Sequence, residues 1–190
     1  AITGGNTNGA FAVDQATRRL VVANVAALDF ETNPVFTLAM SATDNGSPPA
    51  ADTATITVNL SDANDRPTIT AGATLAYTEG DGARVLDGGI VVGDVDSTTL
   101  VGATVRITSG FATGEDVLAA SPPAGITASY AAATGVLTLS GSATLATWQS
   151  VLRGVTYTNT SDAPANGPRT ISWQVDDGGA VANLSNTATS

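Results

Sequence analysis

The residues best suited to chemistry gather in one short stretch, Asp62-Ala63-Asn64-Asp65-Arg66-Pro67. Three of its six residues carry side-chain oxygens suited to a hard cation, and a fourth can offer only its backbone carbonyl. The stretch follows a strongly alternating run from Thr53 to Leu60, which indicates a half-buried strand. Pro67 prevents that strand from continuing, because proline lacks the N–H and fixes φ. The pattern predicts a boundary between two β-domains, with a calcium ion in the hinge.

Composition narrows the chemistry that this chain of 190 residues can perform. It contains no Cys and no His, and all seven cationic residues are Arg. These absences remove disulfides, thiolate and imidazole metal sites, Ser-His-Asp catalysis and Schiff-base chemistry. A carboxylate pair, as in glycoside hydrolysis, remains conceivable, but no large domain with a cleft is expected here. We therefore predict that the protein is not an enzyme.

The net charge of −10 argues against nucleic acid or an anionic membrane as partner, because like charges repel. It suits a protein that binds divalent cations or must stay soluble outside the cell. No apolar stretch approaches the roughly 18 residues of a membrane span. No charged n-region followed by an apolar h-region opens the sequence, so we expect no signal peptide in it. We expect neither nucleic-acid binding nor membrane insertion.

Short Thr- and Val-rich runs, separated by clusters of Gly, Pro and Asp, predict an all-β fold of the sandwich type. Phe36, Leu38 and Met40 alternate with polar or small residues, as in a strand with one buried face. A last strand is expected to begin near Val181.

One segment departs from the strand period and predicts a single short amphipathic helix. Ser142 or Thr144 is its expected N-cap, and Gly154 lies just past its end. Trp148 and Trp173 could suggest sugar stacking, but their spacing places both on buried faces, so we expect core packing. The apolar residues of the helix face are Leu145, Trp148, Val151 and Leu152.

Four motifs follow one another over residues 1–67. They are Gly9-x-Phe11-x-Val13-Asp14, Leu28-Asp29-Phe30-Glu31, Ala42-x-Asp44-x-Gly46 and Asp62-x-Asn64-Asp65-x-Pro67. In this order and spacing they resemble the second half of a cadherin repeat. One departure is Thr17-Arg18-Arg19, where the family usually has a Thr-Gly turn. The opening strands of a repeat, with their Glu ligand, are also missing from this first segment.

A second set of motifs follows Pro67. It consists of Tyr77-Thr78-Glu79-Gly80, Asp94-x-Asp96, Leu145-x-x-Trp148-x-x-x-Leu152-x-x-Val155-x-Tyr157-x-Asn159 and Val175-Asp176-Asp177-Gly178. This set resembles the long cadherin-like repeats of giant bacterial surface adhesins of the RTX, type I-secreted kind, which are related to the chondroitin sulfate proteoglycan repeat. The two resemblances imply tandem cadherin/immunoglobulin-like Greek-key β-sandwiches at 1–66 and 67–190, with the calcium hinge at 62–67. The last strand of the second stops before any further hinge motif.

In cadherin arrays calcium lies between consecutive repeats, so the resemblance implies ligands on both sides of the hinge. The structural alternative is that these Asp and Asn residues merely serve turns and caps. Asp44, Glu79 and Asp162 would face other repeats. The remaining carboxylates, expected to be solvated turn residues, are Asp14, Asp52, Asp81, Asp87, Glu115, Asp116 and Asp176. The implied calcium ligands are Asp29, Glu31, Asp62, Asn64, Asp65, Asp94, Asp96 and Asp177, with the backbone carbonyls of Ala63 and Arg66.

We therefore expect a calcium-rigidified structural spacer of an extracellular adhesin at a bacterial cell surface, active in cell adhesion or biofilms. The alternative is a carbohydrate- or protein-binding module within the same array, for which an exposed aromatic platform would be the structural sign. The expected partners are neighbouring repeats of the same chain. A second copy is a further candidate partner, through the sheet edge that the missing strands leave open.

Overall fold

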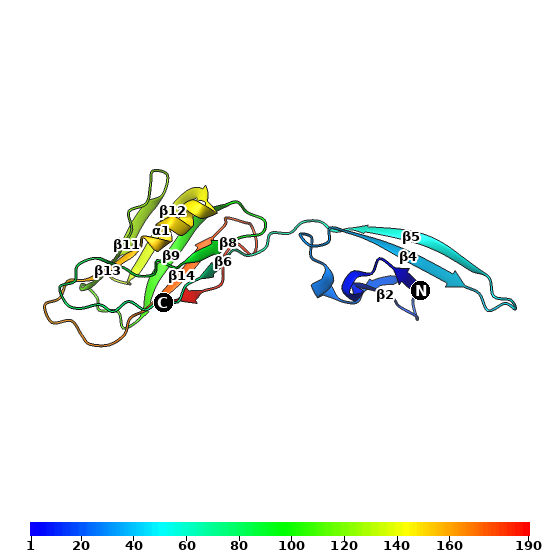
Figure 1. Cartoon of the computed structure of the whole chain (residues 1–190), viewed down its shortest axis with the longest axis horizontal. Coiled ribbons are helices and arrows are strands. Elements are labelled where there is room, and N and C mark those ends of the chain that lie inside the picture. Colours follow the sequence, from blue (N-terminus) through cyan, green and yellow to red (C-terminus); the bar gives the residue numbers. More distant parts are fainter. The chain divides into compact units, whose positions relative to one another are not determined.

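The computed structural model describes all 190 residues, which divide into unit 1, Ala1–Ala63, and unit 2, Asn64–Ser190 (Figure 1). Strands make up nearly all of the regular structure, which confirms the predicted all-β class. The single α-helix belongs to unit 2, as expected. No helix combines the length and the apolar character that crossing a membrane requires.

Unit 1 contains a three-stranded antiparallel sheet in the order β1-β4-β5 and a separate hairpin, β2–β3. The long pair, β4 and β5, stays in register from Val35↔Asn59 to Thr43↔Ala51. Two 3-10 turns, η1 (Thr7–Gly9) and η2 (Val25–Ala27), connect the shorter elements. The strands are β1 (Ile2–Gly4), β2 (Phe11–Val13), β3 (Leu20–Val22), β4 (Val35–Thr43) and β5 (Ala51–Asn59).

The core of unit 1 lies on one face of β4. Phe36 and Leu38 are buried there and pack with Ala10, Phe11 and Ala27. The rings of Phe11 and Phe36 meet edge to face, with centroids 5.1 Å apart and planes at 84°. The alternation seen in the sequence therefore places the apolar residues of β4 on its core side, as predicted.

Unit 2 is built from a five-stranded sheet, β11-β12-β9-β14-β15, and a three-stranded sheet, β10-β13-β7, with a short pair, β6–β8. Both larger sheets are antiparallel. The strands are β6 (Thr68–Thr70), β7 (Arg84–Val85), β8 (Val91–Gly93), β9 (Thr99–Ser109), β10 (Asp116–Ala119), β11 (Thr127–Ala131), β12 (Val136–Thr144), β13 (Thr156–Asn159), β14 (Thr170–Asp176) and β15 (Ala188–Thr189).

The two larger sheets of unit 2 share one hydrophobic core, which makes this unit a sandwich. Val105 on β9 and Trp173 on β14 enter it from the five-stranded sheet. Leu118 on β10 and Tyr157 on β13 enter it from the three-stranded sheet. Trp148 is also fully buried, so the prediction that both tryptophans belong to the core is confirmed.

Helix α1 (Leu145–Arg153) forms where the sequence predicts it. Thr144 is the N-cap, and its hydroxyl accepts a hydrogen bond from the Thr147 N–H at 3.2 Å. The helix ends at Gly154, and Trp148 anchors it by donating from the indole N–H to the Leu100 carbonyl at 2.8 Å. The helix contacts β8, β9 and β12 (Figure 1).

The last strand lies later than expected. It is β15, opposite Ser172 and Trp173 of β14, and not a strand beginning at Val181. The segment before β15 pairs with β14 only through an isolated bridge, Asp176↔Leu184. Its side chains bond backbone groups of neighbouring strands, because Ser185 Oγ accepts the Val175 N–H at 3.0 Å. Asn186 likewise bonds both the N–H and the carbonyl of Ile69, at 3.0 and 2.8 Å. A continuous strand is therefore found only from Ala188.

The expectation that Asp87 and Asp116 are solvated turn residues is wrong, since their exposed fractions are 2% and 1%. The Asp87 carboxylate accepts the N–H groups of Gly72, Ala73 and Gly89 at 2.9–3.0 Å. It therefore fixes the turn that follows β6 and the turn that precedes β8. Burial opposes its ionisation, but these hydrogen bonds outweigh burial and lower its pKa.

Candidate calcium site

The loop after β8 presents Asp94 and Asp96 at one end of unit 2. One carboxylate oxygen of Asp94, Oδ1, accepts the N–H groups of Asp96 and Ser97 at 2.9 and 2.7 Å. The other oxygen, Oδ2, is buried and has no hydrogen-bond partner. A buried carboxylate oxygen without a donor is costly, and a bound cation would satisfy it. The site therefore fits a hard cation on an observation independent of any motif.

Asp177 follows β14, and its side chain continues the buried side of that strand formed by Ile171, Trp173 and Val175. Its exposed fraction is 8%. The Oδ1 atom accepts the Gly179 N–H at 2.6 Å, and Oδ2 accepts the Asn64 side-chain amide at 2.9 Å. This places two sequence-predicted residues side by side, although 113 positions separate them.

The Asn64 amide ties the beginning of unit 2 to two further groups. It donates to the Asp65 carbonyl at 2.9 Å and to the Val181 carbonyl at 3.2 Å. Sequence analysis named Val181 only as the expected start of a strand, and no side-chain signal could have identified it as a partner of Asn64, because the contact uses only its backbone oxygen. The amide thus holds the 64–65 segment against the loop after β14.

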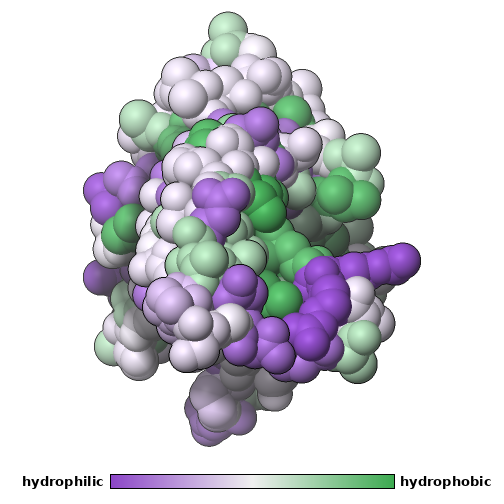
Figure 2. All heavy atoms as spheres, turned by 90° about the vertical axis from the view of Figure 1, so that its right-hand side faces the viewer, coloured by the Kyte–Doolittle hydropathy of each residue, from purple (hydrophilic) through white to green (hydrophobic).

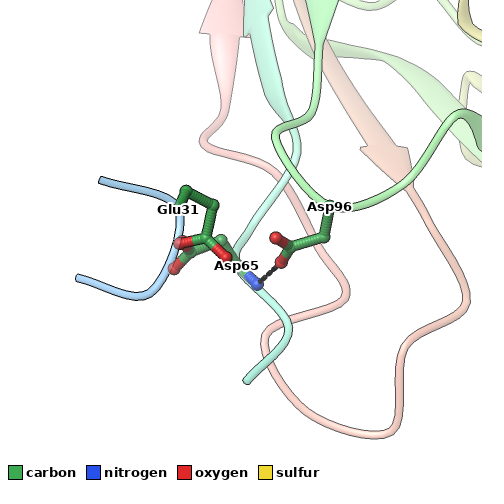
Figure 3. A group of neighbouring side chains, drawn as sticks. All are labelled: Glu31, Asp65 and Asp96. Carbon is green, nitrogen blue, oxygen red and sulfur yellow. Dashed lines mark hydrogen bonds between the residues drawn. The ribbon is translucent and has the colours of Figure 1, made fainter. Parts of the chain in front are cut away.

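The Asp65 backbone N–H donates to the Asp96 carboxylate (Figure 3). Asp65 itself is exposed, as is Arg66, while Pro67 is buried at the entrance to β6. Glu31, also drawn in Figure 3, belongs to unit 1. Hydrogen bonds within unit 2 therefore join Asn64 to Asp177 and Asp65 to Asp96, and Asp94 shares the loop of Asp96.

The candidate ligands of unit 1 occupy exposed positions. Asp29 accepts the Thr32 N–H at 2.8 Å and the Thr32 hydroxyl at 3.0 Å, so in this structure it stabilises a turn. Glu31 lies in the same turn, and Asp62 and Ala63 end the unit. The contacts of Asp29 are therefore those expected if this residue serves only a turn.

The chemistry of the donor set favours calcium over other metals. The candidate ligands in unit 2 are carboxylate, amide and carbonyl oxygens, and the chain has no His or Cys. Zinc and copper prefer nitrogen and sulfur ligands, whereas calcium takes six to eight oxygens in flexible geometry.

No aromatic side chain of the chain is exposed, which removes the structural sign of a sugar-binding platform. Trp148 and Trp173 are each 0% exposed. Tyr77 and Tyr157 pack edge to face at 4.9 Å between centroids, and Tyr157 is buried.

Residues 1–61 match the family model described as "Cadherin domain". Halomucin of Haloquadratum walsbyi is 38% identical over 136 residues, which are 68% of this chain and 2% of that protein. Protocadherin Fat 4 of Mus musculus is 45% identical over 64 residues, 34% of this chain and 1% of that protein. The chain thus spans only a very small part of the curated relatives that it matches.

Solved structures of tandem cadherin domains are similar to this chain at low identity. Extracellular cadherin domains 3–6 of protocadherin gamma B2 align with 17% identity and a TM-score of 0.39, covering 100% of this chain and 37% of that one. Mouse cadherin-23 EC22–24 aligns with 15% identity and a TM-score of 0.40, covering 95% and 48% respectively.

Proposed function

Because residues 1–61 match the cadherin domain, we propose that this chain is a calcium-binding spacer module of an extracellular adhesion protein. The matching family is one of non-catalytic adhesion domains, in line with the absence of the usual catalytic residue types. The observation that carries the calcium assignment is the buried Asp94 Oδ2 atom without a hydrogen-bond partner. A bacterial cell surface is the proposed location.

In unit 2, the carboxylates of Asp94, Asp96 and Asp177 and the carbonyl of Arg66 would hold the ion. The Asn64 amide would add its own oxygen after a half-turn about its last bond, which exchanges nitrogen and oxygen positions. Asp65 and the ligands of unit 1 would complete the set. Those from unit 1 are Asp29, Glu31, Asp62 and the carbonyl of Ala63.

The function of such a set is mechanical. Without a cation the carboxylates repel one another, and residues 62–67 behave as a short flexible linker. Calcium supplies the positive charge that lets these oxygens remain close together. The hinge acids then connect the two units firmly, and an array of such modules holds the tip of an adhesin away from the cell.

Calcium binding is tested by thermal unfolding of the whole chain in millimolar calcium and in excess chelator. Sites of this extracellular class bind with dissociation constants of roughly 10⁻⁴–10⁻³ M, so about 1 mM calcium should stabilise by ~0.4–1.4 kcal/mol per site. Asp96→Asn should lose this response. Asp162→Asn, an equal change of charge at an exposed residue, should keep it. An identical melting temperature in calcium and chelator would refute calcium binding.

Stiffening is tested separately by small-angle X-ray scattering. The native chain should have a longer and better defined maximum dimension in calcium than in chelator. Asp96→Ala should remove this difference while the circular dichroism spectrum stays unchanged. If the native dimensions do not respond to calcium although calcium binds, the spacer role fails, and a ligand-binding role tested on a glycan array takes its place.

A further inference from the structure

Asparagine is followed directly by glycine three times in this chain, as Asn8-Gly9, Asn45-Gly46 and Asn166-Gly167. In such a pair the backbone nitrogen of the glycine can attack the side-chain amide carbon of the asparagine and displace ammonia. Glycine favours this attack, because it has no side chain to shield its own nitrogen. The three pairs differ in how freely that nitrogen can react.

Accessibility to water does not distinguish the three pairs. Asn8, Asn45 and Asn166 are all exposed. Exposed hydrophilic residues are common on this molecule, as the purple spheres of Figure 2 show for one of its faces. The difference between the pairs therefore comes from the hydrogen bonds and charges around each glycine nitrogen.

In two of the pairs a hydrogen bond holds the glycine N–H. The Gly46 N–H donates to Asp44 Oδ1 at 3.0 Å, and the Gly9 N–H donates to the Asn6 carbonyl at 3.1 Å. The nitrogen becomes a nucleophile only when its proton leaves, so each of these bonds must first break. At Gly46 the acceptor is a carboxylate, which strengthens the bond and also repels the negative charge that develops on the nitrogen.

The third pair has no such restraint and lies beside a positive charge. The Gly167 N–H donates to no other group of this chain. Arg169 Nη1 donates to the Ala165 carbonyl at 2.7 Å and to the Gly167 carbonyl at 3.0 Å, so the guanidinium lies against the backbone on both sides of Asn166. A positive charge in this position stabilises the anionic nitrogen and the anionic intermediate that forms when it attacks. The contacts that favour the reaction all lie within residues 165–169.

We propose that Asn166 is a site of spontaneous deamidation and the first of the three pairs to react in the folded chain. The Gly167 nitrogen, after losing its proton to water, forms a bond to Asn166 Cγ. The Cγ–Nδ2 bond then breaks, Nδ2 takes up a proton from water and leaves as ammonia, and a succinimide ring remains. Water opens this ring at the bond from Cγ to nitrogen, which gives aspartate, or at the bond from the backbone carbonyl carbon to nitrogen, which gives isoaspartate. Overall, one water is consumed and one ammonia is released.

The product carries a new negative charge beside Arg169. The Nε atom of Arg169 already pairs with the buried Asp116 carboxylate at 3.3 Å, whereas Nη2 is buried without a hydrogen-bond partner. Isoaspartate also lengthens the backbone between Ala165 and Gly167, whose carbonyls the guanidinium binds. The reaction therefore changes both the charge and the backbone path of this loop. It does not depend on the calcium site, since no candidate ligand lies within residues 165–169.

The test is incubation of the whole folded chain at neutral pH, followed by peptide mapping with mass spectrometry and by labelling with an isoaspartyl methyltransferase. Asn166 should convert at least about tenfold faster than Asn45, whose glycine N–H is bonded to a carboxylate, and several-fold faster than Asn8. Asn166→Gln should abolish conversion at this position, because the attack would have to close a larger ring. The matched control, Asn45→Gln, should leave conversion at Asn166 unchanged.

Incubation of the unfolded chain in concentrated urea separates the effect of the fold from that of the local sequence. Unfolding removes the hydrogen bonds of Gly9 and Gly46 and the contacts of Arg169, so the three pairs should then react at similar rates. If Asn166 reacts fastest by the same factor in urea, the folded loop does not set the rate and the proposal is wrong. Equal rates at the three pairs in the folded chain, or faster conversion at Asn45 than at Asn166, would also overturn it.

Discussion

The hydroxyl of Tyr157 donates to the Asp116 carboxylate at 2.6 Å, and both groups are buried between β10 and β13. The same carboxylate accepts the Asn159 amide at 2.7 Å and the Ala112 N–H at 2.8 Å. Arg169 adds an ion pair at 3.3 Å. Burial, followed by the bond to Asp116, raises the pKa of Tyr157 to about 12, so the phenol stays a donor at neutral pH.

Replacing Asp116 by asparagine should destabilise unit 2 by about 3 kcal/mol, because Arg169 would lose its buried counter-charge. Both tryptophans belong to unit 2, so tryptophan fluorescence during urea unfolding reports this unit alone. Asp162→Asn changes the charge equally at an exposed residue and should leave the midpoint in place. Equal midpoints for the two variants would show that the buried network contributes no stability.

Acid should weaken unit 2 through the same carboxylate and through Asp87. Burial opposes ionisation of both, but hydrogen bonds outweigh it and hold each pKa below the ordinary value of about 3.9. A lowered folded pKa contributes stability that is present above the unfolded value and is lost as pH falls through the folded value. The urea midpoint, followed by tryptophan fluorescence, should therefore fall steeply below about pH 4.

Asp116→Asn should make this acid dependence shallower, since one of the two linked protons is removed. Asp14 and Asp44, whose pKa values are lowered by backbone hydrogen bonds, belong to unit 1 and do not contribute to the tryptophan signal. If the urea midpoint of Asp116→Asn changes with pH as steeply as that of the native chain, the acid sensitivity arises from other residues.

Two glycines allow backbone strain to be separated from close packing. Both Gly141 and Gly125 have positive φ, at +147° and +95°. A Cβ atom on Gly141 would lie 2.0 Å from the Gly125 carbonyl oxygen, whereas one on Gly125 would meet nothing within 4 Å. Gly125→Ala should cost about 1–2 kcal/mol from φ alone. Gly141→Ala should cost at least about 3 kcal/mol, because the backbone must also move. Urea unfolding of the two variants, read by tryptophan fluorescence, measures the difference.

The elements that the sequence predicts well are those whose pattern is local. The period change around Trp148, with a cap on each side, is sufficient to place α1, and the alternation around Phe36 is sufficient to place β4. The last strand lies later than the sequence predicts because side chains before it, Ser185 and Asn186, bond backbone groups of Val175 and Ile69, which are 10 and 117 positions away. Such side-chain substitutes for a ladder leave no periodic signal.

The carboxylates also divide into those that local motifs identify and those that only the folded structure explains. Asp94, Asp96 and Asp177 belong to sequence motifs, and the structure places them in two loops of unit 2. These loops bind the start of the unit, because Asp177 accepts a hydrogen bond from Asn64 and Asp96 accepts one from Asp65. The sequence predicts Asp116 to be one more turn residue, because its partners Tyr157 and Arg169 are 41 and 53 positions away. Only the sandwich brings them together, so burial of a single acid could not be read from its neighbours.

Asp94 Oδ2, which has no hydrogen-bond partner, leads to a prediction for Asp94→Asn in which the sign of the stability change depends on calcium. In chelator, Asp94→Asn should stabilise unit 2 slightly or leave it unchanged. The amide oxygen can still accept from Asp96 and Ser97, and the substitution removes the negative charge from the buried position of Oδ2, which has no donor. In millimolar calcium the variant should be the less stable protein, because it lacks the ~0.4–1.4 kcal/mol that each occupied site contributes. Urea unfolding read by tryptophan fluorescence under both conditions should therefore show the native and variant midpoints changing order.

If the variant is less stable in chelator by as much as it is in calcium, Asp94 acts only as a turn residue. The calcium assignment would then lose the observation on which it depends.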